Sequence, residues 1–445
     1  MPTLAPASLP LLGHLLPLAR DPLAFLESLR SQGEIVRIRL GPQEIHVICD
    51  PDLVHRLLRD DRTFDKGGPV FDRARDGIGN GLITCPHRDH REQRRRAQPA
   101  FHHPRIPVYA RVMTQQVDQI TARWRHGDLD ALAETRRIAF GSLLRTLFDT
   151  EPAAEYLDRL ALLLHTMVHG LYWHTIAPSP SLTRIPVRAN RSFQQAQREL
   201  SAIVDQLIVD SRDRAAEGSH RDSLLSRLVE AGDAEATAPN DGEPRDGELR
   251  DQVLNILAGG TDSTGSALAW ALHLISTHPE VQDALASEAV PLLGARPATW
   301  EDIPHLPATT SAVKEVLRLY PPGWMATRSV TTDTHLGSTA LPQGSTVLFS
   351  AYILGRDPDL YERPHAFEPG RWNDEPGLQT RAHHFPFSVG PRNCIGTQFA
   401  MTELVLAVAT VVSRWRLIPT GHRVKAAARM VLCPRALTLR VEPQI

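Results

Sequence analysis

The stretch that decides the fold is Phe387-Ser-Val-Gly-Pro-Arg-Asn-Cys-Ile-Gly396, which stands directly before a long apolar helical pattern. Gly390 lets the backbone turn tightly where a residue with a Cβ would be strained. The helix that begins after Cys394 offers free N–H groups and a positive dipole end, and both favour the thiolate form of cysteine. Phe387 is suited to shield that thiolate. These ten residues predict a cysteine held as a metal-binding thiolate rather than as an ordinary buried side chain.

A thiolate ligand of this kind suits haem iron, because it pushes electron density onto the metal and favours cleavage of the O–O bond. We therefore expect Cys394 to be the axial ligand of a haem. The other cysteines, Cys49, Cys85 and Cys433, lie far apart and form no C-x-x-C pair, so neither a disulfide framework nor a zinc site is expected. Cys49 and Cys433 read as small buried apolar side chains, whereas the role of Cys85, in a loop, stays open.

The composition indicates a globular protein large enough to enclose a cofactor. The chain has 445 residues, of which 42% are hydrophobic and 22% charged, as in ordinary soluble proteins. Its net charge of −2 gives no argument for binding nucleic acid or an anionic membrane. The apolar segment Leu9–Leu18 is short and is interrupted by Pro10, Gly13 and Pro17, so it predicts neither a membrane span nor a signal peptide. We expect a cytoplasmic protein.

The first hundred residues mix element types. Asp21 as N-cap, Pro22 at the first helical position and Gly33 as the stop predict a helix over Asp21–Gly33. Two alternating apolar runs around Gly41-Pro42 predict a hairpin over 35–48. The stretch 65–86 is rich in Gly, Asp and Pro and predicts a long, substrate-facing loop.

The rest of the chain is mostly helical. The pattern from Arg88 to Glu230 breaks near 126–127, at 151–152 and over 178–186, and 231–247 reads as a flexible surface loop. Further helices are expected at 247–277, 280–293, 308–320 and 395–415, with short strands and loops over 325–349. No internal repeat is present. The expected fold is mainly α with a small β portion, in a single domain spanning 1–445, with the haem between the long buried helix and the helix that follows Cys394.

The helix expected at 247–277 carries Gly-Gly-Thr-Asp-Ser-Thr over Gly259–Thr264. Two adjacent glycines cost roughly 2 kcal/mol in a helix interior relative to alanine, and a buried Asp262 costs more unless it is paired or hydrated. Sequences seldom carry both costs without a functional reason. The hypothesis is a notch over the haem where O₂ binds. The alternative is a close helix–helix crossing made of small residues.

Taken together, the Cys394 segment and the order of the motifs around it resemble the cytochrome P450 family over nearly the whole chain. The resemblance implies haem b as cofactor, with Phe387 in its binding loop. The family's pattern in the notch is small-Gly-x-acid-Thr, so Asp262 matches the acid. Ser263 stands where the family usually has Thr, and its hydroxyl can still donate to dioxygen and organise water. Thr264 could share that catalytic role.

The resemblance also implies a supporting ion network and a set of haem-propionate ligands. Glu315 and Arg318 share one helix face, and the family pairs them with an arginine that matches Arg371; their implied role is to fix the loop beneath the haem. The implied propionate ligands come from four segments of the chain: His90 and Arg94, Arg328, His384, and Arg392.

The implied reaction inserts one oxygen atom of O₂ into R–H, with two external electrons and two protons giving R–OH and water. Asp262 and Ser263 would relay the protons. No flavin or iron–sulfur motif occurs in the chain, so a ferredoxin with its reductase is the expected electron donor. It would dock on the basic side near Cys394, including Arg392 and some of Arg94–Arg96. We expect a monomer.

The expected substrate is lipophilic. The implied pocket lining is mainly apolar and comes from 65–86, 178–186, Leu257 with Ala258, 323–327, and the region of Met430 and Val431. The N-terminal third resembles bacterial terpenoid-oxidising members of the family, so a terpenoid of secondary metabolism is the favoured hypothesis. Two alternatives remain: a peroxide-driven peroxygenase, against which the Asp262-Ser263 pair argues, and a non-enzymatic haem-thiolate sensor or binding protein.

Overall fold

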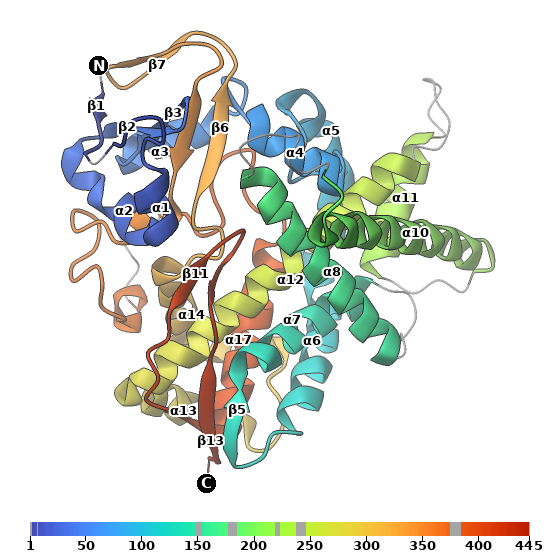
Figure 1. Cartoon of the computed structure of the whole chain (residues 1–445). Helices are drawn as coiled ribbons and strands as arrows, with labels where there is room; N and C mark the ends of the chain where they lie inside the picture. Colours follow the sequence, from blue (N-terminus) through green and yellow to red (C-terminus); the bar gives the residue numbers. More distant parts are fainter. Residues whose placement is uncertain are drawn as a thin grey trace.

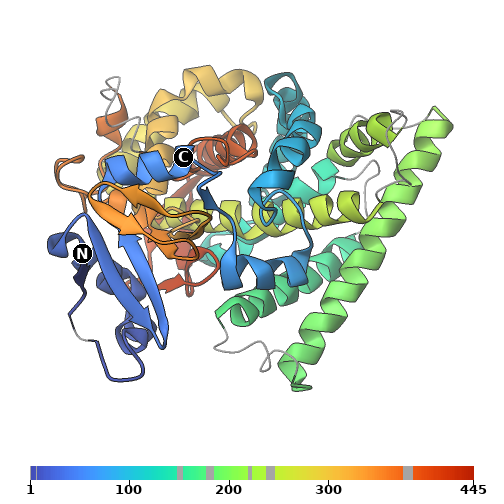
Figure 2. The same ribbon diagram turned by 90° about the horizontal axis from the view of Figure 1, so that it is seen from above.

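The computed structural model of the chain describes residues 2–6, 8–147, 154–176, 185–218, 223–236, 246–373 and 384–444. Helices make up most of the described chain; the largest sheet lies beside the N-terminus, and β5 (Gly127–Asp130) and β13 (Thr438–Pro443) lie beside the C-terminus (Figure 1). Seen from above, the largest sheet lies on one side and the helices on the other (Figure 2). The predicted architecture, mainly α with a small β portion, is confirmed.

The largest sheet has the strand order β1-β2-β3-β9-β6-β4. The predicted hairpin is confirmed as its β2–β3 pair, in which Leu40 lies opposite Gln43 across a Gly41-Pro42 turn with Gly41 at φ 61°. Its strands are β1 (Thr3–Leu4), β2 (Ile35–Leu40), β3 (Gln43–Ile48), β4 (Phe64–Asp65), β6 (Ala326–Val330) and β9 (Thr346–Phe349).

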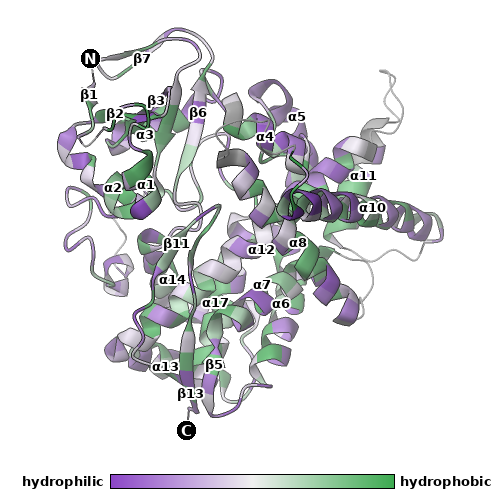
Figure 3. Ribbon diagram, viewed as in Figure 1, coloured by the Kyte–Doolittle hydropathy of each residue, from purple (hydrophilic) through white to green (hydrophobic). Residues whose placement is uncertain are grey.

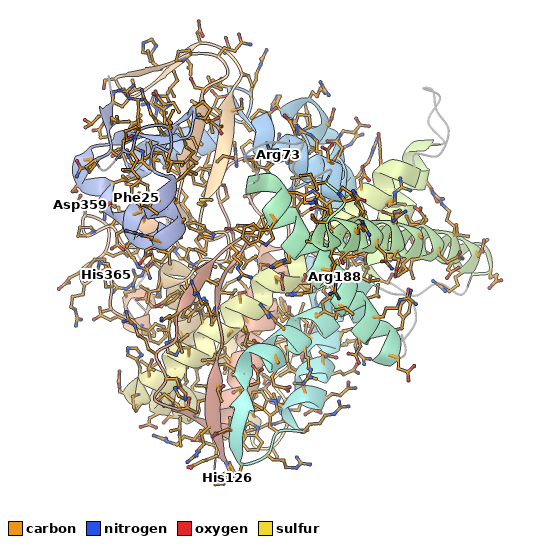
Figure 4. All side chains as sticks on the ribbon, viewed as in Figure 1. Phe25, Arg73, His126, Arg188, Asp359 and His365 are labelled. Atoms are coloured by element: carbon orange, nitrogen blue, oxygen red, sulfur yellow. The ribbon has the colours of Figure 1, made fainter. Side chains whose placement is uncertain are left out.

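Three smaller sheets complete the described β structure. The sheet β10-β13-β5 pairs the two C-terminal strands with the segment after the predicted break at His126-Gly127. Figure 4 labels His126 at the end of the molecule that holds β5 and β13. The strands are β5 (Gly127–Asp130), β10 (Trp415–Pro419) and β13 (Thr438–Pro443), the pair β7 (Thr334–Leu336) and β8 (Thr339–Leu341), and the pair β11 (Ala426–Ala428) and β12 (Leu432–Pro434).

Two helices before the chain midpoint, α2 and α3, begin at an aspartate whose side chain caps the helix. The Asp21 side chain accepts a hydrogen bond from the Ala24 amide at 3.1 Å, as an N-cap does. The helices are α1 (Leu15–Arg20), α2 (Pro22–Ser28), α3 (Pro51–Arg59), α4 (Gly68–Ile78), α5 (His87–Ala97), α6 (Ile106–Thr121), α7 (Ala131–Leu147), α8 (Ala154–Ile176) and α10 (Arg188–Ala216). Short 3₁₀ turns are η1 (Arg30–Gln32), η2 (Gln98–Phe101) and η3 (His103–Arg105).

The helices of the second half enclose the core. They are α11 (Leu224–Ala236), α12 (Asp246–Thr277), α13 (Pro279–Leu293), α14 (Pro307–Leu319), α15 (Ala351–Leu354) and α17 (Thr397–Arg414), with 3₁₀ turns η4 (Trp300–His305) and η5 (Pro369–Trp372). Helix α12 crosses the middle of the molecule and packs on α7, α10 and α17 (Figure 2). Helix α17 is largely hydrophobic and lies inside, whereas the peripheral α10 is largely hydrophilic (Figure 3). The fold thus buries the two helices on which the predicted site stands.

Two loop predictions are corrected. Residues 65–86 are not one long loop, because α4 occupies 68–78 and leaves only 79–86 as the connection to α5. Pro69 sits in the first turn of α4, where its missing N–H costs nothing. Residues 231–236 extend α11 and 246–247 begin α12, so the predicted surface loop 231–247 is shorter at both ends. The breaks predicted at 151–152 and, up to 184, over 178–186 lie outside the described residues.

No described helix is long and apolar enough to cross a membrane. The apolar N-terminal segment forms a short turn and then α1, whose six residues end at Arg20.

Candidate active site

The Cys394 loop is held in one conformation by backbone contacts. The Cys394 amide donates to the Phe387 carbonyl at 2.8 Å, and the Thr397 hydroxyl donates to the Cys394 carbonyl at 2.9 Å. Gly390 has φ 74°, and a Cβ there would lie 2.3 Å from the Leu58 carbonyl oxygen. Glycine is therefore required at this position both by the turn and by the close approach of the chain. Phe387 is half-buried against the main core.

The Cys394 thiol faces open space that lies inside the protein. Cys394 is exposed, whereas Phe385 and Phe399 on either side of it are buried. Desolvation by the surrounding protein nevertheless raises the pKa of the Cys394 thiol above its ordinary value. A side chain that is accessible to water and still surrounded by protein lies on the wall of an internal hollow.

The middle of α12 is open in the same way. Gly259 is exposed although it is the fourteenth residue of a 32-residue helix whose neighbouring turns are buried. The Ser263 hydroxyl donates to the Gly259 carbonyl at 2.7 Å, and Ser263 is itself half-exposed. Residues four apart share one helix face, so Gly259 and Ser263 form one open face of α12.

Thr264 lies on a different face of α12. It is 4% exposed, and its hydroxyl donates to the Gly260 carbonyl at 3.4 Å. A Cβ at Gly260 would lie 2.9 Å from the Leu143 side chain of α7, so this face is the contact with α7. The structure therefore separates Ser263 from Thr264, which the sequence had grouped together. The alternative reading of the glycines, a tight helix crossing, holds for Gly260 but not for Gly259.

Asp262 lies beside this open face. Its side chain is half-buried and makes no hydrogen bond or ion pair with another residue in the described ranges. Its charge reaches Cys433 of β12, whose pKa is raised first by burial and further by Asp262. A half-buried carboxylate without a protein partner needs water or a bound molecule to satisfy it.

Basic side chains from four segments form a cationic cluster at one end of the hollow. We define it as Lys66, His90, Arg328 and Arg392, which lie close enough to shift one another's pKa values. Burial, Arg392 and Lys66 together lower the pKa of His90 to about 3, so its imidazole is neutral. Sequence reasoning had placed three of these four residues together.

Arg392 of this cluster is fully engaged with protein. Its Nε donates to Asp61 Oδ2 at 2.9 Å, Nη2 to Asp65 Oδ1 at 3.0 Å and Nη1 to the Cys85 carbonyl at 2.8 Å. Arg392 is 6% exposed. These bonds fasten the Cys394 loop to the N-terminal segments. That Arg392 also contacts a propionate and faces a docking partner stays a prediction.

Lys66 and Arg328 are the uncompensated members of the cationic cluster. Neither forms an ion pair with a described residue, and the Arg328 guanidinium instead donates to the Thr327 carbonyl and lies 5.4 Å from the Phe349 ring centroid. Burial, together with Arg328 and Arg392, lowers the pKa of Lys66 to about 7. Burial and Arg392 lower the pKa of Arg328 to about 10. Asp65 and Asp61 oppose this shift of the Arg328 pKa from a distance. Two confined cations that form no ion pair with a described residue are suited to bind two anionic groups.

Arg94 lies close to both His90 and Cys394, whereas His384 lies elsewhere than expected. The Arg94 guanidinium donates to the Asn393 carbonyl at 2.5 Å and to Asn393 Oδ1 at 3.1 Å, so it grips the loop next to Cys394. The His384 ring lies 4.7 Å from the Trp372 ring, and burial lowers its pKa to about 3, with Glu315 as the nearest opposing charge. His384 is thus placed in the ion network below the Cys394 loop and not in the cationic cluster.

That ion network confirms the prediction for Glu315, Arg318 and Arg371. Both side chains of the Glu315–Arg318 pair are completely buried, with Nη2–Oε1 at 2.7 Å and Nε–Oε2 at 2.9 Å. Arg371 Nε donates to Glu315 Oε1 at 2.9 Å. Burial alone would raise the pKa of Glu315, but the hydrogen bonds and charge of Arg318 outweigh it and hold that pKa below its ordinary value.

The residues present fit a haem. A flat dianionic macrocycle needs a thiolate on one side, an open helix face on the other and cations at one edge. The chain supplies an accessible Cys394, the open Gly259–Ser263 face and the uncompensated Lys66 and Arg328. All four cysteines are free, and the described residues contain no cluster of three metal-binding side chains.

Comparison with known proteins agrees with this site. The model of the cytochrome P450 family matches residues 2–438. The chain belongs to the cytochrome P450 family. Members of this family bind haem b through a cysteine thiolate, and the chain is accordingly a haem-thiolate monooxygenase, an oxidoreductase that uses O₂ and electrons from a redox partner.

Three curated relatives match nearly end to end. The chain is 39% identical over 445 residues to cyclooctatin synthase of Streptomyces melanosporofaciens, covering 99% of this chain and 96% of the relative. It is 38% identical over 441 residues to pentalenene oxygenase of Streptomyces avermitilis, covering 98% and 96%. It is 40% identical over 417 residues to cyclooctat-9-en-7-ol 5-monooxygenase of Streptomyces melanosporofaciens, covering 93% and 89%.

Two residues of the site were not singled out by sequence reasoning, although both lie in the segment 65–86 that was expected to line the pocket. Lys66 is one of only three lysines in an arginine-rich chain, and that rarity is the signal that could have marked it. Ile83, in the loop after α4, is 39% exposed and lies over Gly259, because a Cβ on that glycine would come 2.7 Å from the Ile83 Cδ1 atom. Nothing local distinguishes Ile83 from any other loop isoleucine, since its neighbour is 176 positions away.

Proposed function

We propose that this monooxygenase oxidises a terpenoid at a haem held by Cys394. The observation that carries the proposal is the accessible Cys394 thiol inside the protein, with the open Gly259–Ser263 face of α12 and the two uncompensated cations around the same hollow. Pentalenene and cyclooctat-9-en-7-ol, which appear in the names of two relatives, are both terpenoids. This supports a cyclic, largely hydrocarbon substrate.

The proposed haem contacts use the chain's own charges. Cys394 is the thiolate ligand, and Lys66, Arg328 and neutral His90 are the proposed partners of the propionates. When bound, the haem supplies reductive activation of O₂, by which one oxygen atom goes to the substrate and the other to water. Arg94 positions the ligand loop through Asn393, and Glu315 with Arg318 fixes the backbone below it.

Asp262 and Ser263 are the proposed proton carriers. A half-buried carboxylate without a described partner can hold a water molecule, and the Ser263 hydroxyl lies on the open face with its proton directed at the Gly259 carbonyl. Rotation of the Ser263 side chain would turn that proton toward the hollow. Thr264 is not included, because its hydroxyl lies on the face that packs on α7.

The exposed apolar side chains support a lipophilic substrate. Three segments expected to line the pocket have exposed large apolar side chains: Val70 and Ile83 at 39% each, Met325 at 37% and Met430 at 38% exposure. A pocket lined in this way gains affinity from apolar surface and offers few groups to bind an acid or an amine. Residues 178–184, also expected there, lie outside the described ranges.

A ferredoxin is the proposed electron donor to a monomeric, cytoplasmic enzyme. Arg91 and Arg95 of α5 are exposed, and α5 touches the Cys394 loop through the bond between Arg94 and Asn393. An acidic partner that docks on this side would come close to the thiolate ligand. Reduction rates that fall steeply with added salt would support this docking, and rates independent of salt would count against it.

The proposed function is tested by spectroscopy and then by turnover. The ferrous–CO Soret band should lie at the red-shifted position of a thiolate-ligated haem, and a band at the position of a histidine-ligated haem would overturn the assignment. A panel of cyclic terpene hydrocarbons and alcohols should shift the ferric Soret band and give oxygenated products with a ferredoxin and its reductase. Shifts with polar macrolides or peptides but with no terpenoid would refute the substrate class. Equal turnover with hydrogen peroxide would favour a peroxygenase.

A further inference from the structure

The loop between α4 and α5 is bound to α12 by a series of hydrogen bonds from loop amides to helix side chains; each of these α12 side chains is called a rung below. The Asn80 amide donates to Asp251 Oδ2 at 2.8 Å, and the Leu82 amide donates to Gln252 Oε1 at 3.1 Å. The next amide, that of Ile83, donates to Asn255 Oδ1 at 3.0 Å. Backbone amides in a loop must find acceptors when they are buried. Here successive side chains of one helix supply them, so the loop follows the helix in a fixed register.

Asn255 is the central rung of this clamp, which we define as Asp251, Gln252 and Asn255. It is 1% exposed, and its Nδ2 donates to the carbonyls of Ile78 and Asp251, each at 2.8 Å. Its Oδ1 accepts the Ile83 amide. The two ends of the amide therefore bind the last residue of α4 and the middle of the loop, which no other side chain of this size could do without leaving a buried group unpaired.

The loop is shaped to accept the clamp. A Cβ at Gly81 would lie 2.4 Å from Asn255 Nδ2, and a Cβ at Gly79 would lie 2.1 Å from the Asp251 carboxyl carbon. Gly79 also has φ 78°, which favours glycine. From the other side, the side-chain Nε2 of Gln93 in α5 donates to the Asn80 carbonyl at 2.6 Å. The loop backbone is thus held between α12 and α5.

The clamp delivers one side chain to the open face of α12. Leu82, Thr84 and Cys85 are buried, whereas Ile83 between them is 39% exposed and lies over Gly259. Asn255 and Gly259 are four residues apart and share a helix face. The residue that holds the Ile83 backbone is therefore one helical turn from the residue that the Ile83 side chain covers.

We propose that Asn255, with Gln252 and Asp251, is a positioning residue for ligand selectivity, which it exerts by fixing Ile83 over Gly259. This deepens the proposed function and rests on it, because the selectivity concerns ligands in the proposed haem pocket. Because Ile83 is already fixed before a ligand binds, binding does not have to order the loop. Ligands whose shape matches the pocket therefore bind more tightly. The affinity of ligands that are too small to reach Ile83 should not depend on the clamp.

The test uses the ferric holoenzyme and two probes of different reach, imidazole and phenylimidazole, both of which bind haem iron and shift the Soret band. Asn255→Leu removes all four side-chain hydrogen bonds of Asn255, including the 3.5 Å bond from the Thr84 hydroxyl, at similar volume. It should weaken phenylimidazole about tenfold while changing imidazole by less than about twofold. Asn255→Asp keeps the acceptor for Ile83 and should give an intermediate loss. Val209→Ala, at an exposed position on α10 outside the expected pocket lining, should change neither probe.

A double-mutant comparison separates positioning from general damage. In an Ile83→Ala background, Asn255→Leu should change phenylimidazole binding by less than about twofold, because the side chain through which it acts is gone. An undiminished loss in that background, or an equal loss for both probes in wild-type background, would overturn the proposal. If Asn255→Leu does not retain haem, Gln252→Met removes a single rung and should weaken phenylimidazole about threefold; no change would refute the clamp. A thiolate-type ferrous–CO band in every case shows that the proposed function itself stands.

Discussion

Arg392 donates from Nε to Asp61 Oδ2 at 2.9 Å, and this ion pair joins the Cys394 loop to the segment that follows α3. The two residues are 331 positions apart, and both are at least nine-tenths buried. The pair holds the loop in place. Lys66 and Arg328 are the cations of the cluster that form no ion pair with a described residue.

Breaking this pair should destabilise the protein strongly. Asp61→Asn leaves Arg392 with one fewer anionic partner in a buried position, which costs roughly 3 kcal/mol. Asp72→Asn is the matched control, because Asp72 pairs with Arg75 in solvent, and its loss should cost less than about 0.5 kcal/mol. Urea unfolding of the two holoproteins measures both values. Equal losses would contradict the structural role of the Arg392–Asp61 pair.

Cys394→Ala should abolish the thiolate-type ferrous–CO band, because no other cysteine can replace the ligand. Cys85→Ala should keep that band, since the buried Cys85 thiol lies beside Arg392 and does not face the hollow. The small cavity that it leaves should lower stability by about 1 kcal/mol. A band unchanged in Cys394→Ala would disprove the ligand assignment directly.

Lys66→Met should loosen the haem without unfolding the protein, because methionine preserves the volume and removes one of two uncompensated cations. A lost charge-assisted hydrogen bond of about 1.5 kcal/mol corresponds to roughly tenfold faster haem transfer to excess apomyoglobin. Lys425→Met, at an exposed position, should transfer haem at the wild-type rate. Identical rates for the two variants would remove Lys66 from the set of haem partners.

Ser263→Ala should uncouple the enzyme, so that product formed per reducing equivalent falls about tenfold or more. Ser263→Thr restores a hydroxyl and should recover most of the coupling. Thr264→Val changes a residue that packs on α7 and should stay within about twofold of wild type. The measurement is the ratio of product to peroxide at equal electron flow. A larger loss in Thr264→Val would mean that the wrong hydroxyl has been assigned.

Glu403 of α17 destabilises the folded protein by an amount that depends on pH. It is 1% exposed, neither carboxyl oxygen has a hydrogen-bond partner among the described residues, and burial raises its pKa to about 8 against a slight opposing effect of Ser142. A carboxyl whose pKa is raised on folding destabilises the folded state at every pH above its unfolded pKa of about 4.3, progressively up to pH 8.

Glu403→Gln removes this ionisation, and its free energy of unfolding should exceed that of wild type by a margin that grows between pH 5 and 8. The margin is on the order of a few kcal/mol and levels off above pH 8. Urea unfolding at a series of pH values measures it. A margin that stays constant with pH would show that Glu403 does not titrate in this range.

Local patterns allowed much of the fold to be predicted. The 3.6-residue period predicted α12 from Gly247 to Thr277, and the structure begins it one residue earlier. Capping residues and a Gly-Pro turn predicted α2 and the β2–β3 hairpin. Helix α4 was missed because its Gly, Pro and Asp content resembles a loop, and packing against α8 and α12 outweighs that weak local preference.

The residues of the site also fall into two groups: those that local patterns predicted and those that depend on tertiary packing. Its motif residues could be found because chemistry fixes their spacing, as between Glu315 and Arg318 on one helix face or between Gly390 and Cys394 in one turn. Lys66 and Ile83 could not be singled out, because the role of each depends on neighbours in space that no sequence spacing connects to it. The same holds for His384, which the motif order assigned to the cofactor and the structure places against Trp372.

The sequence by itself determined the class of this protein: a thiolate loop before a helix, a buried helix with a polar notch, and the ion network that supports the loop. Only the tertiary structure decided which side chains face the hollow: Ser263 does and Thr264 does not. It also decided that Arg392 pairs with Asp61, whereas Lys66 and Arg328 form no ion pair with a described residue. The reason is physical. Helix faces, turns and caps follow from neighbours within four residues, whereas burial, counter-ions and open space depend on segments that meet only when the chain is packed.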